Sequence, residues 1–183
     1  MGKKLILPEI KAAQPPFLRG KEYFEAEDYD NAIKEFTETI KLDPYFSLAY
    51  ACRGRMFLMK KEFNIAINDL TEAIRLDFKN AYAYIQRGGS YLFKREYDKA
   101  INDFTEAIKI DSNDASAYLL RGIGFMKKRE YDTAINDLTE SVKLDPNNAS
   151  AYYFRGEAYI NKGVLDYYEA NSLDNKWDNK FLL

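Results

Sequence analysis

The chain of 183 residues carries 27 Lys and Arg against 29 Asp and Glu, so its net charge is −2. A dedicated binder of nucleic acid or acidic membranes usually has a clear basic excess, and this balance argues against both. With no histidine and one cysteine, Cys52, the sequence excludes imidazole metal sites, Ser-His-Asp and Cys-His catalysis, internal disulfides and thiolate zinc sites. No acid–base pair or other nucleophile stands out, so we expect no enzyme activity, no metal and no other cofactor.

No stretch of the sequence is apolar for as long as a membrane span. The lysines and apolar residues at the N-terminus are followed too soon by Pro8 and Glu9 for a signal peptide. Ile6 stands where a myristoylation motif usually has Ser or Thr. These features favour a soluble, cytoplasmic protein that does not contact a membrane.

From the N-terminus, residues 1–12 are expected to be an extension, because Pro15 and Pro16 are suited to beginning the first helix. The sequence then repeats: residues 97–108 return as residues 131–142, and also match residues 63–74 and 29–40, always at an offset of 34. The predicted domain covers residues 13–168, with repeats at 13–46, 47–80, 81–114 and 115–148 and a partial fifth at 149–168. Residues 169–183 are expected to form a capping helix, with Ser172 as its N-cap, or a tail.

Within each repeat, numbered here as positions 1 to 34, the apolar spacing is helical. In the third repeat, Tyr84, Gly88 and Tyr91 share one helical face, and residues 97–108 carry a second stripe. A short charged turn separates the two, which predicts a helical hairpin with small residues where its helices cross. The residues at position 18 are predicted to cap the second helices. They are Asp30, Asn64, Asp98 and Asp132.

This pattern resembles the tetratricopeptide repeat (TPR) family over residues 13 to about 165. The matching features are a small residue at position 8, an aromatic at 11, Ala at 20, a large apolar residue at 24, and Pro44 and Pro146 at 32. The usual Trp at position 4 is replaced by Tyr, or by Pro16 in the first repeat. The resemblance implies an all-α, right-handed superhelical solenoid of helix-turn-helix units.

Position 7 holds Arg in all five repeats, where the family usually has Leu, and position 23 is acidic in every full repeat. The predicted ion-pair ladder consists of Arg19, Arg53, Arg87, Arg121, Arg155, Glu35, Asp69, Asp103 and Asp137. Because an unpaired buried charge is costly, we predict that these groups pair between helices and are structural. The alternative is an arginine row that binds phosphate or acidic peptides.

Positions 14 and 15 are also basic, as in Lys94 and Arg95. Stacked repeats would align these cations into an edge that could contact nucleic acid. They also suit the C-terminal end of the first helix, and a Glu follows each pair. We favour this local role, so nucleic-acid binding is not expected.

The resemblance implies a concave groove lined by first-helix positions 2, 5, 9, 12 and 13. The residues expected there are Phe17, Lys21, Phe24, Leu48, Arg55, Leu58, Met59, Tyr82, Ile85, Leu92, Phe93, Leu119, Ile123, Met126, Lys127, Tyr153, Glu157 and Ile160. Many are apolar, whereas the outer faces of the second helices are polar apart from Ile65. An apolar exposed face indicates a surface that something covers, although helix curvature could bury part of it against neighbouring repeats.

The predicted function is therefore that of an adaptor or scaffold that binds a partner peptide or helix, with Leu92 and Phe93 at the middle of the groove. The main alternative is a self-associating structural protein, a homo-oligomer in which the tail, the terminal repeat or the groove contacts a neighbouring copy. A more remote alternative is an RNA-binding helical repeat. The carboxylate clamp of chaperone-binding family members is not expected, because Cys52 stands where that clamp has Asn.

Overall fold

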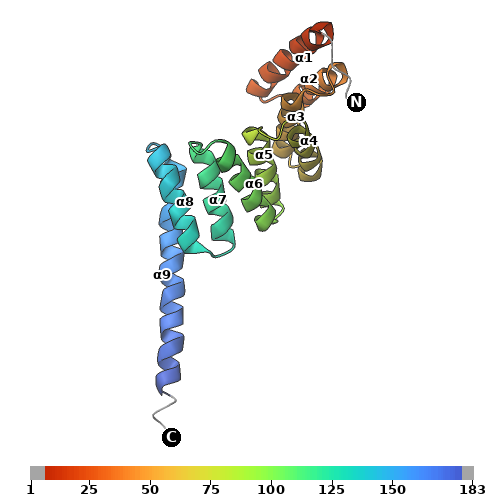
Figure 1. Cartoon of the computed structure of the whole chain (residues 1–183). Coiled ribbons are helices and arrows are strands. Elements are labelled where there is room, and N and C mark those ends of the chain that lie inside the picture. The colour runs from red at the N-terminus through yellow and green to blue at the C-terminus, as the bar shows by residue number, and fades with distance from the viewer. Residues whose placement is uncertain (1–6, 179–183) are drawn as a thin grey trace. The chain divides into compact units, whose positions relative to one another are not determined.

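The computed structural model describes the backbone of residues 7–178 and the side chains of residues 13–164. Within that range the chain is helical without strands, which confirms the all-α prediction (Figure 1). The helices are α1 (Leu7–Glu25), α2 (Tyr29–Leu42), α3 (Ser47–Met59), α4 (Phe63–Leu76), α5 (Ala81–Phe93), α6 (Tyr97–Ile110), α7 (Ala115–Lys127), α8 (Tyr131–Leu144) and α9 (Ala149–Asp178).

The helices form two units that divide after Ser112. In unit 1, α1–α2, α3–α4 and α5–α6 are hairpins, and each hairpin contacts the next through α2 with α3 and α4 with α5. The first helices α3 and α5 also touch. In unit 2, α7 and α8 form a hairpin and α9 packs mainly on α8.

Each hairpin is closed by a glycine at position 8 that meets the large apolar residue at position 24. A Cβ on Gly88 would lie 2.6 Å from Cε1 of Phe104, and one on Gly54 would lie 2.7 Å from Cγ of Leu70. Phe104 and Leu70 are fully buried by this contact. The two helices cross so closely that only glycine leaves room for the packed side chain.

The turns inside the hairpins depart from the predicted caps. The second helices begin at position 17, so their N-caps are Asp28, Glu62, Glu96 and Glu130, and the cap prediction at position 18 is wrong. The reason is the residue at position 15, which is left-handed in all four turns, with φ between 57° at Glu27 and 64° at Arg129. Because the chain reverses at this residue, the second helix is capped two residues earlier than the sequence pattern indicated.

Both ends differ from the predicted boundaries. The first helix begins at Leu7 instead of residue 13, and it passes through Pro15 and Pro16. This is possible because the φ of proline is helical, although each proline lacks a backbone N–H donor. At the other end, α9 runs without a break through Gly163 and Ser172, so Ser172 is not an N-cap. Residues 1–6 and 179–183 of the predicted extension and tail lie outside the described residues.

Candidate functional site

The position-7 arginines bind carboxylates of their own hairpins. Arg87 donates from Nε and Nη2 to the two carboxylate oxygens of Asp103, both at 2.8 Å, and from Nη1 to Oγ1 of Thr71 in the preceding repeat at 3.0 Å. Arg53 makes the same three contacts with Asp69 and Thr37. Each guanidinium therefore joins two helices of its own hairpin to the previous hairpin.

In unit 2, Arg121 binds Asp137 at 2.7 and 2.8 Å in the same forked manner. The tyrosine at position 4 explains part of this geometry, because its ring attracts the guanidinium. The guanidinium of Arg121 lies 5.6 Å from the ring centroid of Tyr118, and that of Arg87 lies 5.7 Å from the ring centroid of Tyr84. Burial raises the pKa of Asp103, and the hydrogen bonds from Arg87 oppose that rise. Because the Nε and Nη2 fork of each guanidinium is already bound to a carboxylate, these arginines offer little to an external anion.

The two ends of the ladder are weaker. Arg19 makes a single 2.8 Å bond to Glu35, and its side chain is 52% exposed. Arg155 lies 5.3 Å from the ring centroid of Tyr152, and position 23 of its repeat, counted at the 34-residue period, is Asn171 instead of a carboxylate. The forked pairing therefore belongs to the second, third and fourth repeats.

The basic turn residues at position 14 form ion pairs with nearby carboxylates. Lys94 and Lys128 each bind the glutamate two residues on, at 2.8 Å. Lys60 binds Asp30 of the preceding repeat. These contacts neutralise the cations at position 14 and leave no continuous basic edge of unpaired charge along it.

In unit 1, two of the predicted groove residues, Phe24 of α1 and Tyr82 of α5, lie against Arg55 of α3. Its guanidinium carbon lies 4.6 Å from the ring centroid of Phe24 and 5.9 Å from that of Tyr82. Nη1 donates to the Tyr82 hydroxyl at 3.2 Å. Burial raises the pKa of Tyr82, and the hydrogen bond from Arg55 opposes that rise. One cation from α3 is thus held between aromatic rings from the helices on either side.

Arg55 and Lys21 have no carboxylate partner among the described residues. On the outer faces, by contrast, the cations at position 29 pair with the glutamate three residues earlier, as Arg75 does with Glu72. The charges of Lys21 and Arg55 also reach Cys52, where they oppose the burial that raises the thiol pKa to about 11. The inner face of unit 1 therefore carries two uncompensated cations among apolar side chains.

The other predicted groove residues of unit 1 differ in exposure. Leu48 and Met59 are exposed, whereas Ile85 and Leu92 are half-buried. Phe17 packs its ring 5.7 Å from Phe36 and belongs to the core of the first hairpin. Leu58 packs in the same way against the core of the second hairpin. Packing against the hairpin cores thus buries part of the expected lining.

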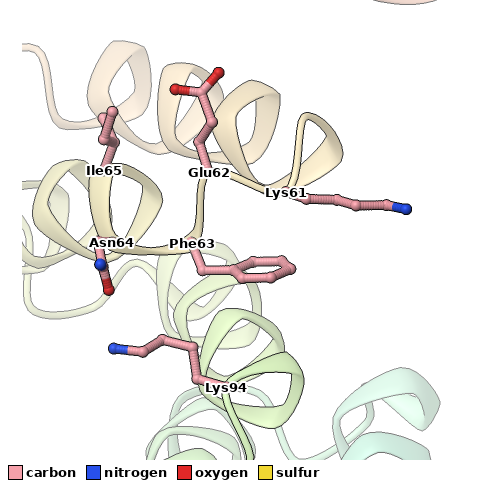
Figure 2. A pocket seen from close by; sticks show the side chains of 6 residues that line it. All are labelled: Lys61, Glu62, Phe63, Asn64, Ile65 and Lys94. Carbon is pink, nitrogen blue, oxygen red and sulfur yellow. The ribbon is translucent and has the colours of Figure 1, made fainter.

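Phe93 is the last residue of α5, and its ring contacts Phe63 instead of facing the inner face of unit 1. It is 68% exposed and stacks on Phe63 at 5.3 Å, with the ring planes 6° apart. Beside this pair is an open pocket of about 370 Å³ lined by Lys61, Glu62, Phe63, Asn64, Ile65 and Lys94. Figure 2 shows Phe63 and Lys94 close to each other at the start of α4 and the end of α5, while Lys61 extends away. The exposed Ile65 was the one sequence signal for this patch.

In unit 2, Leu119 and Met126 pack against the buried residues of α8, and Ile123 is half-buried. Lys127, Tyr153 and Ile160 are exposed. Glu157 is half-buried and its backbone carbonyl accepts a hydrogen bond from Asn161. The structure therefore divides the predicted lining of this unit between core and surface.

The described side chains contain no group of three or more metal-binding residues, and no described helix has the length and apolarity to span a membrane.

The sequence matches models of the tetratricopeptide repeat at residues 17–46 and 81–114, and a TPR repeat model at residues 124–163. Among solved structures, MamA is 24% identical with a TM-score of 0.73, over 93% of this chain and 96% of MamA. The Arabidopsis OM64 TPR domain is 30% identical with a TM-score of 0.60, over 61% of this chain and 93% of that domain. YrrB, a TPR protein with an unusual peptide-binding site, is 20% identical with a TM-score of 0.68, over 82% of this chain and 78% of YrrB. The search of curated proteins found no match. The repeat models and the hairpin architecture together establish that this chain is an all-α helical repeat solenoid that belongs to the tetratricopeptide repeat family.

Proposed function

We propose that this repeat scaffold binds a partner protein on the inner face of unit 1, formed by α1, α3 and α5, and that the bound segment is apolar and carries a carboxylate. Membership of the family supports a protein-interaction scaffold. YrrB, which is similar in fold, is a TPR protein with an unusual peptide-binding site. The chemistry of the segment follows from the residues of the face itself.

The observation that carries this proposal is the arginine at the centre of the face. Arg55 is held between Phe24 and Tyr82, and only its Nη1 has a hydrogen-bond partner among the described residues. Its remaining N–H groups form a fork that suits a carboxylate, and charge-assisted bonds of this kind are about twice as strong as neutral ones. The aromatic rings hold the guanidinium in place before binding, which lowers the entropy lost on binding.

The apolar part of the proposed segment follows from the other predicted groove residues on α3 and α5. Leu48 and Met59 on α3 are exposed, and Leu58 and Ile85 are only half-buried. A segment that covers these side chains would remove apolar surface from water, at about 25 cal/mol per Å². The cation at Lys21 would add attraction for an acidic segment and set its direction.

Arg55→Glu tests the proposal, with Arg75→Glu as its control. Both variants change the charge equally, but Arg75 lies on the outer face, paired with Glu72. Partners captured by the wild type are expected to be retained by Arg75→Glu and lost by Arg55→Glu. The minimal binding peptide of a captured partner should also lose affinity when its acidic residue is replaced by the corresponding amide. A folded Arg55→Glu protein that keeps every partner would disprove the proposal.

We also infer that the chain is not an enzyme, works in the cytoplasm and does not bind RNA. The sequence lacks the residues of common catalytic sites, and the position-14 cations are paired. Fluorescent tagging would test the location. An RNA complex that weakens steeply with salt would contradict the last inference.

A further inference from the structure

In the fifth repeat, no second helix packs against the face of the first helix that carries Gly156. In the four full repeats the glycine at position 8 faces a large side chain of the second helix, but a Cβ on Gly156 would meet nothing within 4 Å. Around it, Tyr152 is 46%, Tyr159 56% and Ile160 69% exposed. In Figure 1 the C-terminal half of α9 runs on beyond α7 and α8, with no helix of unit 2 beside it.

The sequence of a second helix is nevertheless present, five residues early. Residues 160–174 read INKGVLDYYEANSLD, and residues 63–77 of the second repeat read FNIAINDLTEAIRLD. The two segments share five residue types in their first half: Asn at position 18, a small residue at 20, a branched apolar residue at 21, Asp at 23 and a large apolar residue at 24. They also share Glu at 26, Ala at 27, Leu at 30 and Asp at 31. In the fifth repeat these are Asn161, Gly163, Val164, Asp166, Tyr167, Glu169, Ala170, Leu173 and Asp174.

A five-residue deletion explains this shift. Relative to the third repeat, the fifth lacks the equivalent of Leu92-Phe93-Lys94-Arg95-Glu96, which ends α5 and makes the turn, with Arg95 in the left-handed conformation. Without a turn the two helical halves join, and α9 is indeed one helix of 30 residues. A continuous helix cannot fold back on itself, so its second half is available only to another molecule.

We propose that two copies of this chain pair through α9 in antiparallel fashion, each supplying residues 160–174 as the second helix of the other's fifth repeat. Deletion of a hinge is a known route to exchange of an element between identical chains. The second copy is the occupant because the complementary helix is encoded in this same chain. This inference is independent of the binding face on unit 1.

The register of the proposed pair follows from the intact hairpins. There the arginine at position 7 binds the acid at position 23, and the glycine at 8 meets the residue at 24. The same register places Arg155 opposite Asp166 of the second copy, and Gly156 opposite its Tyr167. Both pairings occur twice about a two-fold axis near Asn161. Within one chain, Arg155 and Asp166 are separated by 11 helical residues, about 16 Å, and cannot meet.

Restoring the turn is the direct test. The wild type is expected to have twice the 21.3 kDa chain mass by light scattering. Insertion of Leu-Phe-Lys-Arg-Glu between Tyr159 and Ile160 should complete the fifth hairpin within one chain, so the variant should be a monomer with unchanged helix content by circular dichroism. A wild type that is monomeric well above micromolar concentration, or a folded insertion variant that stays dimeric, would overturn the proposal.

Charge reversal gives a second test that does not depend on the inserted hairpin folding. Arg155→Glu and Asp166→Arg should each raise the dimer dissociation constant about tenfold or more, and the double variant should recover most of the loss. Such recovery can arise only between copies, because the two groups are too far apart in one helix. Ser150→Glu, on the exposed start of the same helix, is the control and should leave the dissociation constant unchanged. Single variants that dimerise like the wild type, or a double variant that does not recover, would overturn the register.

Discussion

Removal of Arg87 is the sharpest test of the energetics of the repeat. The substitution Arg87→Ala deletes two bonds to Asp103 and one to Thr71, and it leaves the Asp103 carboxylate, whose side chain is only 8% exposed, without a cation. Breaking a buried pair from one side costs about 3–5 kcal/mol, and the partial exposure of this pair places the loss at about 2–4 kcal/mol. Because the penalty comes from the stranded charge, Arg87→Ala with Asp103→Ala should recover part of it.

Urea denaturation followed by circular dichroism measures this loss. Arg19→Ala is the matched control, because Arg19 occupies the same repeat position with one exposed bond to Glu35 and should lose at most about 1 kcal/mol. Without Arg87 the pKa of Asp103 should rise further above its unfolded value. The folded state then holds its proton more tightly, so the deficit should shrink as pH falls through the folded pKa. An Arg87→Ala loss no larger than that of Arg19→Ala would refute the reasoning.

Three further outcomes can be measured on the same protein. Lys61→Gly should raise the free energy of unfolding by about 1 kcal/mol, because Lys61 has φ of 63°, whereas Lys60→Gly, at φ of −78°, should lower it. Gly54→Ala should lower the free energy of unfolding by about 1–3 kcal/mol in thermal or urea unfolding, because the new Cβ would lie 2.7 Å from Cγ of Leu70. Gly54→Ala with Leu70→Ala should relieve this overlap, but it should not restore the packing that Leu70 provides. Alkylation of Cys52 at pH 8 should be about a hundredfold slower than alkylation of a free thiol, because burial raises the pKa of this thiol to about 11. The rate should rise about tenfold per pH unit up to that pKa. A rate equal to that of a free thiol would contradict the burial of Cys52.

Part of this architecture can be predicted from the sequence alone, because each weak local pattern recurs at the same position of every repeat. One hairpin with a Gly, an Ala and an amphipathic stripe is ambiguous, but four copies at one spacing leave little choice of fold. The same holds for Arg87 and Asp103, since their recurrence at fixed positions indicated that they lie near each other. The third contact, from Arg87 to Thr71, crosses between repeats. Thr also recurs at position 25 of every full repeat, but its spacing does not show that it meets the arginine of the next repeat.

The sequence alone determined the 34-residue hairpin, its glycine crossing points and the periodic charges, because these depend on spacing along the chain. Only the tertiary structure decided which side chains remain available: Arg55 lies between rings from two other helices, and Phe93 turns to Phe63 instead of the inner face. Such outcomes depend on packing between segments distant in sequence, and no local pattern specifies which neighbour a side chain will meet.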